Sequence, residues 1–138
     1  KEDLKVHLAL NPNIGVLKLY PGISVQAVEA ITNSSVDAII LETFGSGNTT
    51  TAEWFIKSLE QALESGKLIV DITQCKRGSV ELGMYETSKK LQQMGVISGY
   101  DMTFEATTTK LMYLMGLGLK RAEIARLMEL SLRGELTA

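Results

Sequence analysis

The strongest constraint on the fold lies in residues 39–51, where an apolar segment runs into a glycine-rich turn and then into a helical pattern. Residues 39–41, Ile-Ile-Leu, form a short continuous apolar run, which is typical of a strand covered on both faces. Gly45 and Gly47 allow positive φ angles and close approach of a ligand or another chain. The stretch predicts a strand–turn–helix unit whose turn lies where parallel sheets bind polar ligands. A turn that binds nothing fits the same residues, because a lone Gly-x-Gly is a weak motif.

The helix after this turn has its own start and stop signals. Thr50 and Glu53 fit a capping box, in which each side chain satisfies a backbone amide of the first helical turn. Apolar side chains at helical spacing continue from about residue 51 to residue 65. Gly66 follows at the position where glycine commonly ends a helix.

The same alternation of apolar strand, polar loop and helix repeats along the chain. The other strands are expected at residues 15–20, 68–70 and 95–99. The other helices are expected near residues 24–33, 85–91, 103–115 and 120–132, with Ser24 capping the first and Asp101 and Thr103 the third. This order predicts an α/β fold of three layers, a parallel sheet of about four strands flanked by helices on both faces (Rossmann- or flavodoxin-like). The loops after the strands, residues 20–22, 43–48, 73–79 and 99–103, should form its functional rim.

Residues 1–12 are interpreted as a linker or edge strand that precedes a domain at residues 13–138. Three apolar side chains alternate with others in this segment, Val6, Leu8 and Leu10. The alternation predicts one covered face. His7 is the only histidine and has no second ligand at metal-binding spacing, so we expect a surface histidine. Because the chain starts at Lys1 without Met, we expect it to be a piece of a longer or trimmed protein.

Composition limits the classes of partner. The 138 residues are 45% hydrophobic and 22% charged, which is enough for one soluble domain with a substantial core. The formal net charge of −2 argues against a nucleic-acid partner. No apolar run approaches the roughly 20 residues that a membrane span needs. One cysteine excludes an internal disulfide and fits a reducing cytoplasm.

No standard catalytic arrangement occurs in the sequence. A phosphate-binding P-loop, a Gly-x-Ser-x-Gly elbow and a Cys/His pair are all absent, and we expect no metal and no cofactor. Cys75 lies next to two cations that would favour its thiolate, yet a partly buried structural cysteine is the preferred interpretation. The methionines are interpreted mostly as packing residues, and residues 107–110, Thr-Thr-Thr-Lys, as a solvated helix face with one or two buried methyls.

Five motifs follow one another in a fixed order: 20–22 Tyr-Pro-Gly, 41–48 Leu-Glu-Thr-Phe-Gly-Ser-Gly-Asn, 73–75 Thr-Gln-Cys, 95–103 Gly-Val-Ile-Ser-Gly-Tyr-Asp-Met-Thr and 132–137 Leu-Arg-Gly-Glu-Leu-Thr. Each motif is weak alone, but the ordered set resembles the C-terminal domain of cytoplasmic type I bacterial L-asparaginases. The resemblance runs from about residue 13 to residue 137.

The resemblance implies a parent enzyme that hydrolyses L-asparagine to L-aspartate and ammonia through a threonine nucleophile. In that family the catalytic residues lie in an N-terminal domain, so it implies no catalytic residue in this chain. The C-terminal domain supplies the rim of a neighbouring subunit's active site in a homodimer or tetramer. The rim residues that match are Gly45, Ser46, Gly47, Asn48 and Tyr85.

Some members of the family are activated by asparagine at a second site, and the resemblance places Cys75 and Thr73 there. The regulated enzymes carry an arginine where this chain has Glu42. A carboxylate repels the carboxylate of an amino-acid effector, so we expect regulation of that kind to be lost.

Two other functions fit the same sheet and rim. One is a non-catalytic ligand-binding or regulatory α/β domain, which the length of the full gene product would distinguish. The other is the asparaginase-like subunit of a tRNA-dependent amidotransferase, although the acidic charge balance gives no support for tRNA binding.

Overall fold

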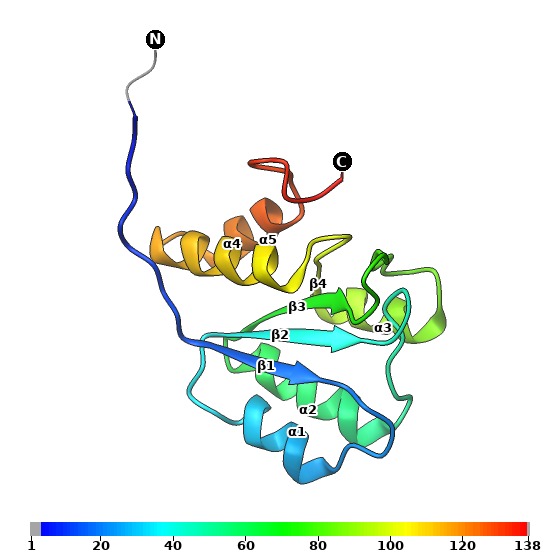
Figure 1. The fold of residues 1–138 in the computed structure, drawn as a ribbon. Helices are drawn as coiled ribbons and strands as arrows, with labels where there is room; N and C mark the ends of the chain where they lie inside the picture. Colours follow the sequence, from blue (N-terminus) through cyan, green and yellow to red (C-terminus); the bar gives the residue numbers. More distant parts are fainter. Residues whose placement is uncertain (1–3, 138) are drawn as a thin grey trace.

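Short apolar segments form the strands of a parallel sheet that lies between two layers of helices (Figure 1). The computed structural model describes residues 4–137. The elements follow the chain as β1 (Ile14–Lys18), α1 (Val25–Thr32), β2 (Ala38–Thr43), α2 (Glu53–Glu64), β3 (Leu68–Thr73), α3 (Glu86–Met94), β4 (Ile97–Ser98), α4 (Phe104–Gly116) and α5 (Arg121–Met128). The expected fold class and all four expected strands are confirmed, with shifts of a few residues at their ends.

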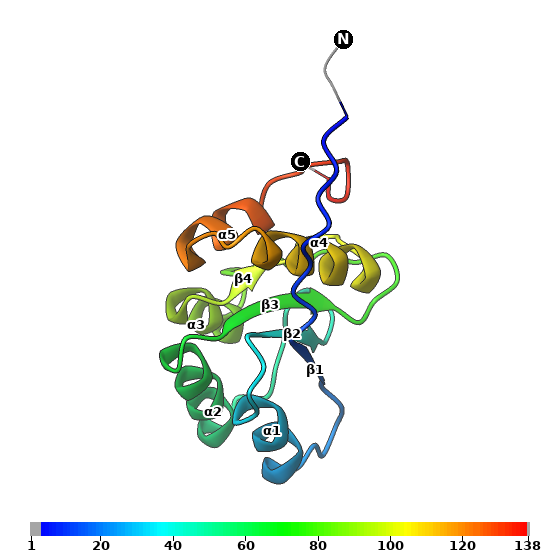
Figure 2. The ribbon, with the colours of Figure 1, turned by 90° about the vertical axis from the view of Figure 1, so that its left-hand side faces the viewer.

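The strands lie side by side in the order β1-β2-β3-β4, and every pair is parallel. Because right-handed crossovers that progress in one direction stay on one face, α1, α2 and α3 all cover the same side of the sheet. Figure 2 shows α4 and α5 on the opposite side. The order contains no reversal, so these four strands lack the switch point of a Rossmann or flavodoxin sheet. Any polar site therefore depends on the loops at the carboxyl ends of the strands.

The central strands β2 and β3 contribute side chains to two cores, one on each face of the sheet, which explains their consecutive apolar residues. Ile39 and Leu41 pack against the side of the sheet that carries α2, together with Phe55 and Leu59. Ile40 lies between them in sequence and packs on the α4–α5 side. Successive side chains of a strand point to opposite faces, so a sheet covered twice needs apolar residues at consecutive positions.

Of the helix caps expected from sequence, those at Ser24 and Thr103 are present, and those at Thr50 and Asp101 are not. The side chains of Ser24 and Thr103 accept hydrogen bonds from backbone amides in the first turns of α1 and α4, as expected. The capping box at Thr50 is wrong, because α2 begins one residue after Ala52 and the Thr50 hydroxyl accepts the Ala52 amide at 3.2 Å. Asp101 does not cap α4; its carboxylate accepts both the amide and the hydroxyl of Thr137 in the C-terminal tail.

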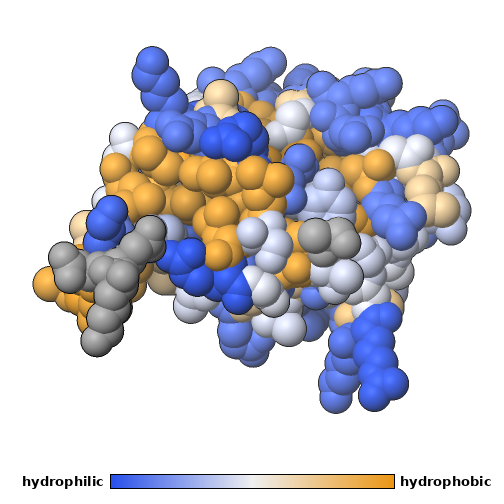
Figure 3. All heavy atoms as spheres, turned by 90° about the horizontal axis from the view of Figure 1, so that it is seen from above, coloured by the Kyte–Doolittle hydropathy of each residue, from blue (hydrophilic) through white to orange (hydrophobic). Residues whose placement is uncertain are grey.

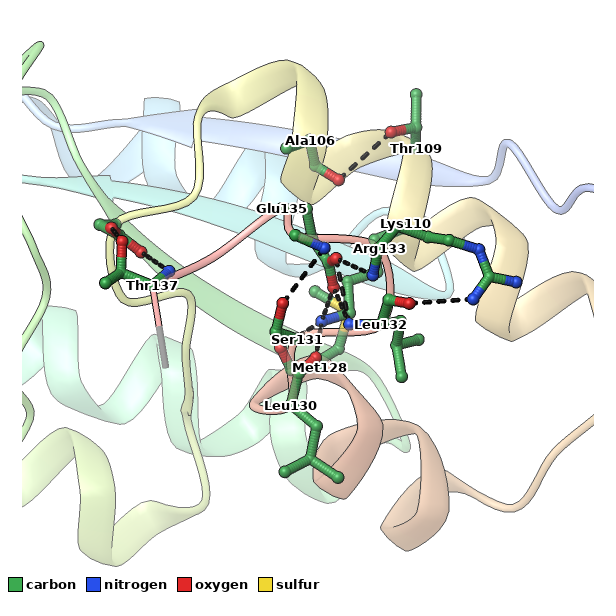
Figure 4. A network of polar contacts seen from close by, with 12 residues as sticks. Ala106, Thr109, Lys110, Met128, Leu130, Ser131, Leu132, Arg133, Glu135 and Thr137 are labelled. Atoms are coloured by element: carbon green, nitrogen blue, oxygen red, sulfur yellow. Dashed lines mark hydrogen bonds and ion pairs between the residues drawn. The ribbon is translucent and has the colours of Figure 1, made fainter.

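The side chain of Lys110 ends the last helix earlier than the sequence pattern suggests. Its Nζ donates to the carbonyls of Met128 at 2.9 Å and Leu130 at 2.5 Å, and it forms an ion pair with Glu135 at 2.6 Å (Figure 4). α5 therefore stops at Met128, and the chain turns back over α4 instead of continuing as helix to residue 132. The interpretation of residues 107–110 as a solvated face with one or two buried methyls is wrong at Lys110, which is buried, whereas the burial of Thr107 agrees with it.

The described part of the N-terminal segment, residues 4–10, has no regular secondary structure. It runs away from the sheet in Figure 1, and the side chains of Val6, Leu8 and Leu10 are exposed. The expectation of a strand with one covered face is therefore wrong for these residues. The ring of His7, an exposed residue as expected, meets the ring of Tyr113 edge-on with centroids 5.5 Å apart.

Candidate functional site

All four strands point the same way, so the loops after them gather at one edge of the sheet, the rim that the sequence predicted. The turn at residues 45–48 is closed by two backbone hydrogen bonds between Phe44 and Asn48, of 2.9 and 2.8 Å. Gly45 has φ +52° and Gly47 has φ +107°, conformations that favour glycine. The expected positive φ angles are thus confirmed, and the turn is a fixed feature of the rim.

Thr73 ties the third strand to this turn. Its hydroxyl donates to the Gly45 carbonyl at 2.5 Å and accepts the Cys75 amide at 3.0 Å. The structure therefore brings Thr73 and the 45–48 turn together. The thiol of Cys75 is exposed, so the preferred interpretation of a partly buried cysteine is wrong.

Glu42 does not share the face of Thr73. It lies in register with Ile72, which packs into the α4–α5 core, whereas Thr43 lies in register with Thr73. Because side chains alternate along a strand, Glu42 and Thr73 point to opposite faces of the sheet. The Glu42 carboxylate lies 3.8 Å from the ammonium of Lys18 on β1.

Gln74 is a structural residue of the rim that the sequence analysis did not single out. Its side-chain amide donates to the carbonyls of Leu19 at 2.6 Å and Glu42 at 2.8 Å, while its backbone amide donates to Thr43. One side chain thereby links the carboxyl ends of three strands. The only available signal was its place in the Thr-Gln-Cys motif.

The segment from Val80 to Tyr85, which leads into α3, borders the rim next to the 45–48 turn. The Glu81 amide donates to the Ser46 carbonyl at 3.3 Å, which joins this segment to the 45–48 turn. Tyr85 precedes α3 and is exposed, and so is Met84, which is an exception to the interpretation of the methionines mostly as packing residues. Two adjacent large side chains are therefore presented to solvent beside the turn.

Asp71 is the second rim residue that was not predicted from sequence, because the strand was expected to end at residue 70, whereas β3 continues to Thr73. It lies in β3 with no solvent exposure, and one carboxylate oxygen accepts the Thr43 hydroxyl at 2.7 Å. Burial raises the pKa of Asp71 to about 7, against the opposing effect of the Thr43 hydrogen bond. A buried carboxyl thus lies beneath the polar edge of the sheet.

The rim offers backbone amides, carbonyls and hydroxyls, which suit recognition of a polar ligand. Within residues 4–137, no group of three or more His, Cys, Asp and Glu side chains could hold a metal ion. No helix in the same range has the length and apolar character needed to cross a membrane.

A separate apolar surface covers the α4–α5 side of the molecule, seen as the orange area in Figure 3. It contains a cavity of about 660 Å³. Its lining includes Tyr113, Leu114, Leu117, Leu127 and Leu132. We call these five residues the apolar face.

The fold, the rim and the ordered motifs define a class of protein, and sequence comparison agrees. Residues 13–128 match the Glutaminase/Asparaginase C-terminal domain family, and the chain belongs to that family. It is 42% identical over 135 residues to L-asparaginase 1 of Escherichia coli K12, covering 98% of this chain and 40% of that protein. It is also 39% identical over 138 residues to a human 60 kDa lysophospholipase, covering 99% of this chain and 24% of the human protein.

The structural match is equally extensive. The crystal structure of L-asparaginase I from Vibrio cholerae superposes with a TM-score of 0.92 at 41% identity, over 99% of this chain and 41% of that one. The chain therefore spans about 40% of the length of these asparaginases and corresponds to their C-terminal part.

Proposed function

We propose that the chain acts as the C-terminal domain of an L-asparaginase, which hydrolyses L-asparagine to L-aspartate and ammonia. The observation that carries this proposal is 42% identity to an asparaginase over nearly the whole chain, combined with an intact rim at the expected motifs. No cofactor is required in the proposal.

The 45–48 turn and Tyr85 are proposed to form the substrate-side rim. Gly45 is exposed, Ser46 and Asn48 are half-buried, and the backbone of Glu81 holds the turn against the segment that leads to Tyr85. Backbone hydrogen bonds of 2.8–3.3 Å hold the turn in this arrangement, and an ordered turn reduces the entropic cost of binding. The nucleophile and its assisting groups are proposed to come from the remainder of the parent enzyme, so the chain alone is inactive.

The parent is proposed to work as a homodimer or tetramer in the cytoplasm. The exposed pair Met84 and Tyr85 and the apolar face both offer surface for contact with other parts of the enzyme. A two-fold assembly would place the same patch of each copy in contact with its counterpart.

The fold separates the residues that the resemblance places at a second, effector-binding site. Thr73 and Cys75 lie by the turn, but Glu42 points to the opposite face and pairs with Lys18. We propose that the parent lacks asparagine activation of the family's kind, because no cation stands at that strand position and the carboxylate faces away.

An asparaginase-like component of an amidotransferase stays the alternative. The chain is 32% identical over 136 residues to one subunit of the glutamyl-tRNA(Gln) amidotransferase of Pyrococcus abyssi, covering 99% of this chain and 31% of that protein. The formal net charge of −2 disfavours a surface that neutralises RNA phosphates. A filter-binding titration with tRNA at low salt distinguishes the two, since only the amidotransferase component should retain tRNA.

The rim assignment is tested in the full-length protein that contains this chain. Tyr85→Ala should raise the KM for asparagine by at least about tenfold, the loss expected for about 1.4 kcal/mol of binding energy. Leu130→Ala is the matched control, because Leu130 is 45% exposed and Tyr85 is 48% exposed. Equal kinetic constants for the two variants would contradict the rim assignment.

A further inference from the structure

The buried carboxyl of Asp71 is satisfied on one side only. Its Oδ1 accepts the Thr43 hydroxyl at 2.7 Å, and its Oδ2 has no hydrogen-bond partner among residues 4–137. Most buried polar atoms in folded proteins have a partner, so an unpaired carboxyl oxygen with no solvent contact calls for an explanation.

The backbone of the 45–48 turn lies directly over this unpaired oxygen. A Cβ atom at Gly47 would stand 3.4 Å from Asp71 Oδ2 and 3.3 Å from the Val80 side chain. Thr43, which donates to the other oxygen, is separated from the turn by a single residue. The carboxyl therefore lies beside the turn, with room for no more than a methyl group at Gly47 between them, and it is hydrogen-bonded to the strand that leads into the turn.

Among the described residues, no charged group beside the Asp71 carboxyl explains its protonation state. The groups that face it are the Thr43 hydroxyl from β2, Ser98 as its register partner on β4, the Gly47 backbone, and the Val80 and Leu82 side chains that also contact Gly47. None of them is titratable near neutral pH. The Ser98 hydroxyl donates to the Val80 carbonyl and so is already engaged. The nearby ionisable residues of the same segments point elsewhere, since Glu42 faces the other side of the sheet and Glu81 is exposed.

We propose that Asp71 is a positioning residue whose protonation state sets the conformation of the 45–48 turn. The neutral acid leaves the turn seated, because an uncharged carboxyl costs far less to bury beneath Val80 and Leu82 than a carboxylate does. The carboxylate is strongly disfavoured there without a donor. Ionisation therefore favours a second arrangement, in which a turn amide or water reaches Oδ2 and Gly47 moves away from β3.

The midpoint of this change follows from the environment. Burial raises the pKa of Asp71 to about 7, with the Thr43 hydrogen bond acting in the opposite direction. This pKa belongs to the seated arrangement, and a second arrangement that favours the carboxylate can only lower the observed midpoint, so the turn should be seated in acid and displaced by about pH 7. The device lies within the chain itself and goes beyond the proposed hydrolysis of asparagine.

The test is an NMR titration of the uniformly ¹³C- and ¹⁵N-labelled 138-residue chain between about pH 5 and about pH 9. The carboxyl carbon of Asp71 and the amides of Gly45 and Gly47 should titrate together, with one common midpoint above the ordinary value of 3.8 and no higher than about 7. Asp71→Asn should abolish the titration of both glycine amides. Asp37→Asn, which changes an exposed aspartate, is the control and should leave the midpoint unchanged.

A second variant keeps the proposal testable if Asp71→Asn does not fold. Thr43→Val removes the hydroxyl that stabilises the carboxylate with little change in shape, so the common midpoint should move to higher pH. The proposal is overturned if Asp71 titrates near pH 4, if the glycine amides do not follow its midpoint, or if their titration persists in Asp71→Asn. These outcomes concern the turn alone and do not depend on whether the full-length protein hydrolyses asparagine.

Discussion

Replacing Lys110 with methionine is the perturbation that should damage this fold most specifically. The Lys110 side chain is 5% exposed and its ammonium contacts three oxygens: the Met128 and Leu130 carbonyls and the Glu135 carboxylate. Methionine fills a similar volume but satisfies none of these oxygens. Figure 4 shows that they come from the end of α5 and the tail that folds back over α4. The substitution should therefore loosen the whole region after residue 128.

The expected magnitude is about 3 kcal/mol of lost unfolding free energy, the low end for removing one partner of a buried ion pair. The lower end applies because the Glu135 side chain is 14% exposed and, without Lys110, still accepts hydrogen bonds from the backbone amides of Leu132 and Arg133. Lys18→Met is the matched control. Its ion pair with Glu42 is 3.8 Å long and Lys18 is 63% exposed, so the loss should stay below about 0.5 kcal/mol.

Urea unfolding of the chain, followed by circular dichroism, measures both values. The double variant Lys110→Met/Glu135→Leu should lose about 1–3 kcal/mol less than the sum of its two single variants, because the carboxylate no longer lacks a partner. If Lys110→Met costs no more than Lys18→Met, the buried network does not hold the tail and this reasoning is refuted.

The Lys110–Glu135 network also predicts that the free energy of unfolding decreases at acid pH. Burial alone would raise the pKa of Glu135, but the hydrogen bonds from Lys110 and from backbone amides lower it to about 2, below its ordinary value of 4.5. The stabilisation is therefore complete above about pH 4.5 and is lost as the pH falls toward 2. In Lys110→Met this loss should be smaller, since the main group that lowers the pKa is gone.

Three further predictions follow from the rim. The native pKa of Asp71 lies above its ordinary value of 3.8, so wild type should lose stability as the pH rises between 3.8 and about 7. Asp71→Asn should remove that loss, with no difference from wild type below about pH 4 and a gain of up to about 4 kcal/mol above pH 7, measured by urea unfolding at each pH; identical pH profiles would contradict it. Gly47→Ala should cost more than Gly66→Ala, because both force alanine to a positive φ at about 1–2 kcal/mol but only the Cβ at Gly47 meets neighbours; equal melting temperatures would argue against the packed turn. The full-length protein should show hyperbolic asparagine kinetics that Cys75→Ala leaves unchanged, and Glu42→Arg should also leave them hyperbolic because residue 42 faces away from Thr73; a sigmoidal wild-type curve abolished by Cys75→Ala would make Cys75 an effector-site residue.

The sheet could be predicted from sequence because its strands are covered on both faces. Ile39, Ile40 and Leu41 must all be apolar to serve two cores, and that run is visible without a structure. The positive φ angles of Gly45 and Gly47 were predictable for a similar reason, since glycine is the residue that adopts them at least cost.

The errors fall where long-range contacts override a local pattern. Lys110 lies in a polar run that resembles a solvated face, yet its partner Glu135 arrives from 25 residues further along the chain. The Thr50 capping box failed because the turn positions Ala52, two residues later, at the start of α2. Local propensity contains neither the fold-back of the tail nor the width of the turn.

The candidate site shows the same division. The family resemblance predicts the turn, Thr73 and Tyr85 as site residues, whereas the contacts of Asp71 and Gln74 arise through strand register. Gln74 reaches carbonyls of Leu19 and Glu42, which are 55 and 32 residues away in sequence. Only the parallel alignment of three strands makes one side chain central to the rim.

The most direct test of the central claim is ammonia release from L-asparagine by two proteins, the 138-residue chain alone and the full-length protein that contains it. The account predicts that the full-length protein releases ammonia and forms aspartate, while the folded chain alone releases none. Turnover by the isolated chain would show that it contains its own nucleophile and would contradict the account. So would a correctly folded full-length protein that does not act on asparagine.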